Sequence, residues 1–498
     1  MADRIFRLTH LWRQYVSLVE NHPVIVLVVC SSLFLSLGWW QNGINLDSTT
    51  YSVIARNMMD HGHWFNPTYT TYSHPNFAEH PPLVMWAQAV LFWLFGATDS
   101  TARLFGAICT TGSVLAVFWL GRSVGGKRLG LLSGLVLILT YNFMQGGNST
   151  LLDYPMTFFV LMALAGLAHI SSEEDRVIPR WAYVVTGLAL GCSFLTKGVV
   201  SGPVWIGMFT GFLLHHHWSI TPRVETPHAR THYVWLIPGI AIFLVGAYLV
   251  LDQWFADGHF LEHYFLIQIG RRFMGGGPKI HTDWYEFLFR FAKLYLPWII
   301  LLPVGVYSVV KKKVTMLLPL SITLILYIIS YSSAAKLYYH YFAPAYALSA
   351  VFVALGLTTF IKMRMVPTIA AVFLIIWMSL GIGVTAAGVK IHHIRCTTVY
   401  NLTDKMTDLF RQSEGRNGIM VCPHQPDWDI IAKTAWYWHS DVAWTNSLED
   451  AGEIVRTNPD FSYLLLPPED GQLSTTHQPD NFTLYAGDDK LAVYIPIQ

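Results

Sequence analysis

The residues of this chain with the clearest chemical potential are ionisable side chains that stand beside apolar segments. Asp47 follows the apolar run 24–40, and Glu79 and His80 precede the apolar stretch 83–95. Ionisable groups at membrane depth are costly, so they tend to be functional. A carboxylate there can accept or orient the proton of an attacking hydroxyl group, and a protonated histidine can neutralise a phosphate. These residue types suit group transfer on a phosphate-bearing lipid.

Further ionisable side chains lie beside later apolar segments: Asp153, Lys197, Arg272 and Lys336. Arginine and lysine side chains are good partners for a lipid phosphate. Each basic residue taken alone could instead extend its side chain to lipid headgroups. Asp153 stands two residues before Pro155, so it could be an N-terminal helix cap, with or without a role in an active site. As a set, the residues indicate one charged site at a membrane surface.

The composition indicates a polytopic membrane protein. Of the 498 residues, 53% are hydrophobic and only 13% are charged, whereas soluble domains carry about 25% charged residues. The net charge is +1 and there is no long basic run. Because nucleic-acid affinity depends on many phosphate contacts, we exclude nucleic acid as a partner and expect membrane lipids instead.

Eleven segments are apolar enough to span a bilayer. They cover residues 22–40, 104–121, 129–146, 155–170, 181–197, 199–217, 232–251, 291–310, 314–331, 338–360 and 366–388. The stretch 83–95 is shorter and rich in aromatic residues, which favours a helix lying in the membrane interface. If it does not cross, the short inner connections hold fifteen of the 32 Lys and Arg residues. The positive-inside rule then places the N-terminus inside and the C-terminal tail outside.

The chain changes character near residue 390, where polar turns alternate with short apolar strands such as 418–422 and 463–466. This pattern predicts a transmembrane domain over 1–389 and a small soluble α/β domain over 390–498. Cys396 and Cys422 lie in this tail. They could form a disulfide in an oxidising compartment or remain two free thiols.

Motifs of several other chemistries are missing from the sequence, which has no Walker glycine loop, no His-Glu-x-x-His pair and no Cys-x-x-Cys pair. Glu79 beside His80 is a weak candidate for a metal ligand, because metal sites need further ligands at suitable spacing. A hydrogen-bonded structural pair is the alternative for these two residues. The sequence therefore assigns no cofactor and leaves a divalent metal open.

Six short motifs occur in an order that resembles a known family. They are Asp47-x-x-x-Tyr51, Glu79-His80-Pro81-Pro82-Leu83-x-x-Trp86, Thr101-Ala102-Arg103-Leu104, Leu152-Asp153-Tyr154-Pro155, Phe194-Leu195-Thr196-Lys197-Gly198 and Lys336-x-x-x-x-Tyr341-x-x-Pro344. This series covers residues 20–350. It resembles the bacterial glycosyltransferases related to dolichyl-phosphate-mannose protein mannosyltransferases, which include the enzyme that adds aminoarabinose to lipid A.

The resemblance implies a GT-C membrane fold with its active site at the outer membrane face. It also implies that Asp47 is the catalytic acid of the first loop and Asp153 the second-loop acid near the acceptor. His80 stands where the aminoarabinose branch has a lysine, and Ile269 stands where it has a histidine. Aminoarabinose and that branch's metal site therefore do not follow. The expected donor-phosphate ligands are His80, Arg272, Lys197 and Lys336, and the expected supporting residues are Glu79, Tyr51 and Tyr341.

We therefore expect an inverting glycosyltransferase of the bacterial inner membrane, with its active site and tail facing the periplasm. It would move a sugar from a polyprenyl phosphate, such as undecaprenyl phosphate, to an envelope acceptor such as lipid A, a glycolipid or a glycan. One displacement needs only a base and a stabilised leaving group. The alternatives are a protein O-mannosyltransferase and a transporter or flippase for lipid-linked sugars, in which charged residues line a path across the membrane.

Overall fold

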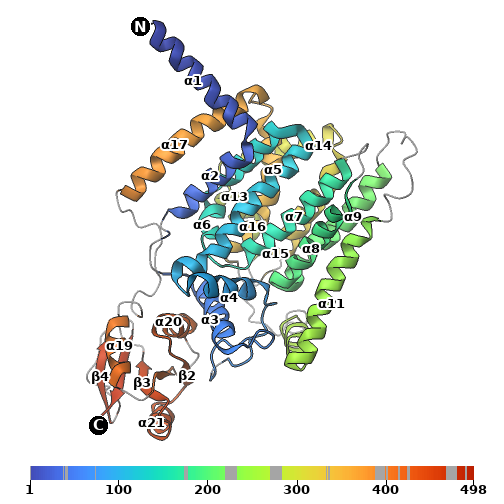
Figure 1. The fold of residues 1–498 in the computed structure, drawn as a ribbon. Coiled ribbons are helices and arrows are strands. Elements are labelled where there is room, and N and C mark those ends of the chain that lie inside the picture. The colour runs from blue at the N-terminus through green and yellow to red at the C-terminus, as the bar shows by residue number, and fades with distance from the viewer. Residues whose placement is uncertain are drawn as a thin grey trace. The chain divides into compact units, whose positions relative to one another are not determined.

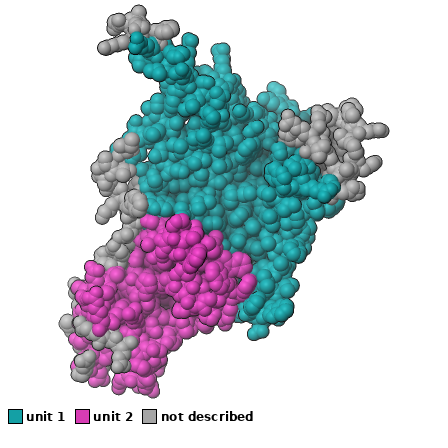
Figure 2. All heavy atoms as spheres, viewed as in Figure 1, with its two compact units in different colours: residues 1–39, 79–84, 103–389 teal, residues 40–78, 85–102, 390–498 magenta. Residues whose placement is uncertain are grey.

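The computed structural model divides into two compact units, drawn as ribbons in Figure 1 and coloured separately in Figure 2. Unit 1 comprises residues 1–39, 79–84 and 103–389, and unit 2 comprises residues 40–78, 85–102 and 390–498. Within these units the structure describes residues 2–37, 39, 43–72, 74–172, 178–218, 233–269, 283–332, 334, 337–386, 399, 402–412, 415–422, 427–466, 479, 481–487, 491–497.

Within the described residues of unit 1, the regular secondary structure is helical. Its α-helices are α1 (Ala2–Asn21), α2 (Pro23–Ser36), α5 (Asp99–Ile138), α6 (Tyr141–Gly147), α7 (Asp153–Ser172), α8 (Arg180–Lys197), α9 (Gly202–Trp218), α11 (Leu236–Ala256), α13 (Glu286–Leu294), α14 (Leu302–Lys311), α15 (Leu318–Ser332), α16 (Ala343–Leu357) and α17 (Val366–Ala386). Short 3-10 segments adjoin several of them, including η1 (Gly198–Ser201) and η5 (Tyr339–Phe342), and η2 (Leu261–Ile269) is a π-helix.

Seven helical stretches in the described part of the chain are long and apolar enough to cross a membrane, or nine if each of two bent pairs is one span. The bent pairs are 7–21 with 23–36 and 286–294 with 298–311. Each of the eleven predicted segments overlaps a helix of unit 1. The structural count is lower because the stretches 99–138 and 180–211 each hold two predicted segments. The protein is a multi-pass membrane protein, and the number eleven stays a prediction.

The 40-residue element α5 holds two predicted spans because it folds back on itself at Gly126. This residue has φ 80° and ψ −178°, a conformation that glycine adopts readily. The two halves pack closely, since a Cβ on Gly130 would lie 2.5 Å from the carbonyl oxygen of Phe118, and one on Gly121 would lie 2.5 Å from Ser133 Oγ. The break therefore separates two packed helices.

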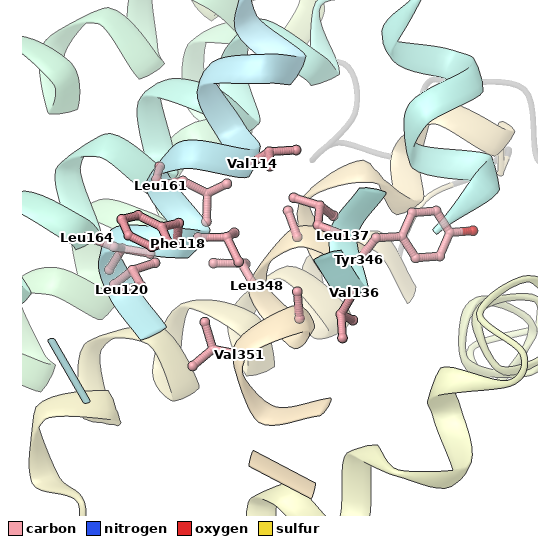
Figure 3. Close-up of a cluster of buried hydrophobic side chains, with 14 of the residues drawn as sticks. Val114, Phe118, Leu120, Val136, Leu137, Leu161, Leu164, Tyr346, Leu348 and Val351 are labelled. Atoms are coloured by element: carbon pink, nitrogen blue, oxygen red, sulfur yellow. The ribbon is translucent and has the colours of Figure 1, made fainter. Parts of the chain in front are cut away.

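The core of unit 1 lies around α16, of which residues 343–356 are all buried. Figure 3 shows Phe118 of α5, Leu161 of α7 and Leu348 and Val351 of α16 meeting in one cluster. Lipid tails are as apolar as these side chains, so close packing rather than exclusion of water stabilises such a cluster. The cluster holds α5, α7 and α16 against one another, and thereby fixes the position of the first residue of α7.

Unit 2 contains a five-stranded sheet with the order β2-β1-β3-β5-β4. Its strands are β1 (Asn417–Val421), β2 (Val442–Thr445), β3 (Phe461–Leu466), β4 (Phe482–Gly487) and β5 (Ala492–Pro496). β1 is parallel to β2 and β3, whereas β5 is antiparallel to β3 and β4. Val455 of α21 (Leu448–Thr457) packs with Ile419 and Leu464 of the sheet. The predicted α/β domain is therefore present, and the predicted strands 418–422 and 463–466 fall on β1 and β3.

Unit 2 also includes segments from outside the predicted domain 390–498, namely 40–78 and 85–102. These carry α3 (Leu46–His61) and most of α4 (Leu83–Phe95). α3 packs on α20 (Trp428–Trp438), and the ring of Phe92 in α4 lies 5.6 Å from that of Trp436 in α20. The compact unit differs from the predicted domain because these contacts join segments that are far apart in the chain.

The helix α4 has the size expected of a helix in the membrane interface. Its 13 residues extend about 20 Å, less than the ~30 Å of a bilayer core. Its described surface exposes Trp93 and Phe95, which are 74% and 64% exposed. Aromatic side chains are enriched at membrane interfaces, and the interpretation that 83–95 does not cross stays a prediction.

Candidate functional site

A buried ion pair joins Asp153 and Lys197 in unit 1. The distance between Lys197 Nζ and Asp153 Oδ1 is 2.6 Å, and the two side chains are 8% and 1% exposed respectively. Asp153 is the first residue of α7, and Lys197 is the last residue of α8. Because α7 packs against α8, the start of one helix lies beside the end of the other. Asp153 is thus the first residue of α7 itself. Its carboxylate forms an ion pair with the Lys197 ammonium group.

Two further side chains approach the carboxylate of Asp153. The hydroxyl of Tyr331, at the end of α15, donates to Asp153 Oδ1 at 3.3 Å. Nε2 of His340 in η5 lies 3.7 Å from Oδ2. On the other side of the pair, Lys197 Nζ lies 4.8 Å from the ring centroid of Tyr341, within the range of a cation–π contact. Four elements thus contribute to one compact charged group.

The backbone after Lys197 is held by Tyr264 of η2. The Tyr264 hydroxyl accepts from Val199 N at 2.9 Å and donates to the Lys197 carbonyl oxygen at 3.3 Å. Gly198 has φ 63°, and a Cβ there would lie 1.9 Å from the Tyr264 hydroxyl. The Phe194-Leu195-Thr196-Lys197-Gly198 motif therefore has a structural explanation, because only glycine admits the tyrosine that fixes the end of α8.

The pair can bind an anion without losing its own contact. An ammonium group carries three N–H donors, so Lys197 can hold Asp153 and still donate to a second acceptor. Asp153 in turn compensates the lysine charge in surroundings where an isolated charge would be costly. A phosphate oxygen is a suitable second acceptor, since charge-assisted hydrogen bonds to phosphate are short and strong.

Asp47 lies in unit 2, in the first turn of α3. Asn45 caps this helix by accepting from Ser48 N at 2.9 Å. Asp47 is half-buried, and a carboxylate in the first helical turn is stabilised by the helix dipole. Tyr51, one turn later, is buried with its ring 6.4 Å from that of Phe77. The helix start thus presents a carboxyl group on a fixed backbone.

The structure places the other predicted site residues as follows. Glu79 and His80 are half-buried in unit 1, just before α4. Arg272 and Lys336, and Cys396 of the tail, lie outside the described residues. Of the predicted set, the structure brings together Asp153, Lys197 and Tyr341, and a single site that also includes the other predicted residues stays a prediction.

Two open questions from the sequence concern metal and thiol chemistry. Among the residues that the structure describes, no group of three or more His, Cys, Asp or Glu side chains is placed to hold a metal ion. Glu79 therefore remains a weak candidate, and metal dependence is not assigned. Cys422 carries a free thiol.

Sequence reasoning missed Tyr331 and Tyr264. Tyr327 and Tyr331 are four residues apart in an apolar helix, so they share one face of it, and Tyr327 contacts Met156 of α7 through its hydroxyl at 3.8 Å. Two tyrosines at that spacing in a membrane span could have indicated a polar contact with a neighbouring helix. No sequence pattern indicates the role of Tyr264, because its hydroxyl binds backbone atoms.

A family model described as dolichyl-phosphate-mannose-protein mannosyltransferase matches residues 79–248. The matched region holds Asp153 and Lys197. The undecaprenyl phosphate-alpha-4-amino-4-deoxy-L-arabinose arabinosyl transferase of Erwinia tasmaniensis is 24% identical over 263 residues, which are 52% of this chain and 44% of that protein. The chain spans about half the length of the relatives of this kind that it matches.

The crystal structure of ArnT from Cupriavidus metallidurans in the apo state matches over 98% of each chain, with TM-score 0.72 and 15% sequence identity. The structure of the same protein bound to undecaprenyl phosphate matches with TM-score 0.70 and 15% identity over 97% of this chain and 98% of that chain. The fold is therefore that of the GT-C glycosyltransferases, as predicted. In sequence the chain is similar to the aminoarabinose transferases and, over residues 79–248, to the protein mannosyltransferases.

Proposed function

We propose that this protein is an inverting glycosyltransferase that moves a sugar from a polyprenyl-phosphate donor to an envelope acceptor, which is lipid A, a glycolipid or a glycan. The reaction takes place at the periplasmic face of the bacterial inner membrane, and the C-terminal domain faces the same side. The observation that carries the proposal is the buried pair of Asp153 and Lys197 in a chain with the ArnT fold.

The proposed reaction is a single displacement. Asp47 orients or deprotonates the acceptor hydroxyl, which attacks the anomeric carbon of the donor sugar. The bond from that carbon to the phosphate oxygen breaks, and the polyprenyl phosphate leaves with the electron pair. In this proposal Asp153 is the acid near the acceptor, and its ion pair with Lys197 orients the lysine for the leaving phosphate. His80, Arg272 and Lys336 complete the phosphate site, with Glu79, Tyr51 and Tyr341 in support.

The distribution of buried charge supports an enzyme rather than a transporter. In the described part of unit 1 the buried Asp, Glu, Lys, Arg and His side chains are Arg103, Asp153, Lys197, Asp252 and His340. All five lie at or near helix ends: Arg103 and Asp153 near the starts of α5 and α7, Lys197 and Asp252 near the ends of α8 and α11, and His340 in η5 before α16. A path for a lipid-linked sugar would require such groups near the midplane and beyond. An active site at one membrane face does not require charged groups near the midplane.

A protein O-mannosyltransferase is the second candidate, favoured by the description of the family model that matches residues 79–248. The two candidates differ in their product. We expect mass spectrometry of a strain that lacks the gene to show the loss of a glycosylated envelope lipid or glycan, restored by the wild-type gene. Loss of hexose from envelope proteins with unchanged lipids would favour the second candidate, and an unchanged envelope would contradict both.

A further inference from the structure

The carboxylate of Asp99 is the centre of a hydrogen-bond cluster in unit 2. Its Oδ2 accepts from the backbone N–H of Gly43 at 2.5 Å and from the Tyr437 hydroxyl at 3.0 Å, and its Oδ1 accepts from Trp436 Nε1 at 2.7 Å. Hydrogen bonds to an ionised carboxylate are stronger than neutral ones. Because Gly43 stands four residues before Asp47, Asp99 ties the segment that leads into α3 to the tail helix α20.

Arg56 makes a second connection between α3 and α20, nine positions after Asp47 in the sequence. Its Nη2 donates to the Ala435 carbonyl oxygen at 2.8 Å, and its Nη1 donates to that of Trp436 at 3.2 Å and lies 3.2 Å from His439 Nδ1. The last carbonyls of a helix lack intrahelical partners, so the end of α20 is a natural acceptor. Arg56 is only 7% exposed, and its burial fixes this geometry.

The loop after α3 makes a third connection to the tail. Thr71 N donates to Asp441 Oδ2 at 2.6 Å, next to strand β2. The ring of Tyr72 lies 4.7 Å from that of Phe461, the first residue of β3. The segment before α3, the body of α3 and the loop after it are therefore all attached to the C-terminal domain.

We propose that the C-terminal domain is a positioning element for Asp47, with Asp99 and Arg56 as the positioning residues through which α20 fixes the start and the roll of α3. The proposal rests on the proposed function, because it gives the tail the task of orienting the acid that the transfer requires. The side chain of Asp47 leaves from the first turn of α3, so a tilt or roll of the helix moves its carboxylate. A displacement of ~1 Å can lower a rate about 100-fold.

The test uses the full-length protein, in the deletion strain for product formation and in lipid nanodiscs for binding. Arg56→Ala removes the donors to α20, and Asp99→Asn removes one acceptor oxygen. We expect each variant to form about 10- to 100-fold less product, with unchanged affinity for undecaprenyl phosphate, because neither residue belongs to the phosphate site. Tyr437→Phe removes only the hydroxyl that donates to Asp99 Oδ2, so we expect it to fold normally. It should lose less product than the other two variants, but still form less than the wild type.

Matched controls are available in α19 (Thr403–Gln412) of the same unit. Arg411 and Asp408 form an exposed pair at 3.2 Å. Arg411→Ala and Asp408→Asn repeat the two chemical changes away from α3 and are expected to leave product formation unchanged. Hydrogen exchange of residues 43–58 supplies a readout that does not depend on activity. Exchange of this segment should be faster in Arg56→Ala and Asp99→Asn than in the wild type or the controls.

The outcomes separate this proposal from the proposed function. Wild-type exchange and wild-type product formation in both variants, with Asp47→Asn inactive, would overturn the positioning role and leave the function intact. Faster exchange of 43–58 together with normal transfer by Asp47→Asn would overturn the function, and the positioning role with it. A loss of undecaprenyl phosphate affinity that parallels the loss of product would also overturn the positioning role, since the effect would then reach the donor site.

Discussion

Lys197 and Asp153 hold each other in a 2.6 Å contact between Nζ and Oδ1 that is almost closed to solvent. Removal of one partner of a buried pair leaves an uncompensated charge and costs about 3–5 kcal/mol, whereas removal of both can be close to neutral. We predict that Lys197→Met and Asp153→Leu each lower the free energy of unfolding by about 3 kcal/mol. The double variant should lose less than the sum. Unfolding of all four proteins in one detergent measures the coupling.

The matched control for this cycle is the pair of Arg411 and Asp408, whose side chains are 75% and 63% exposed. Exposed pairs contribute about 0–1 kcal/mol, so the equivalent substitutions should shift unfolding by less than ~1 kcal/mol. Additive losses at Lys197 and Asp153 would show that the two charges do not depend on each other.

His80 and Arg272 give a matched test of the donor-phosphate site. We expect both His80→Ala and Arg272→Ala to weaken undecaprenyl phosphate binding in a nanodisc titration. Histidine and arginine side chains carry N–H donors that can bind a phosphate oxygen. The ratio of wild-type to variant affinity should therefore exceed one for both variants and stay at one for the control Arg411→Ala. A ratio of one for His80→Ala or Arg272→Ala would remove that residue from the site.

The stability of unit 2 should depend on pH through Asp441. Burial raises the pKa of the Asp441 carboxyl above its ordinary value of 3.8, and hydrogen bonds from Thr71 and Val442 offset part of the effect. Because the folded pKa is the higher one, ionisation of Asp441 opposes folding at neutral pH. This cost disappears as the pH falls through the folded pKa toward 3.8. As the pH is lowered from 7, the melting temperature of the wild type should rise relative to that of Asp441→Asn. A difference in melting temperature that does not change with pH would contradict this.

The topology can be tested by labelling a cysteine just after α4. Gly96 has φ 82°, so a side chain there would strain the backbone, and Ala97→Cys is the better probe. In a background whose native cysteines are alanine, this cysteine should react with an impermeant reagent from outside the cell. Lys312→Cys, in a predicted inner connection, should react only after the membrane is opened. Labelling of Ala97→Cys from the inside alone would show that α4 crosses and would reverse every later segment.

Much of the architecture could be predicted from the sequence, because apolar length and strand periodicity are local properties. The helices that the eleven predicted segments overlap, and the strands 418–422 and 463–466, follow from these local properties. Local properties of the sequence could not predict the contact between Asp153 and Lys197, because it depends on how α7 packs on α8. The roles of Arg56 and Asp99 were also hidden, because their partners include a backbone N–H and backbone carbonyls, which every sequence carries.

In the proposed reaction, Asp47 is required for the sugar transfer from a polyprenyl phosphate. The most direct measurement is mass spectrometry of envelope lipids and glycans from the deletion strain that carries either the wild-type gene or Asp47→Asn, with both proteins at equal levels in the membrane. We predict that the glycosylated product returns with the wild type and stays absent with Asp47→Asn. Equal product from both genes would show that the transfer does not need the Asp47 carboxylate.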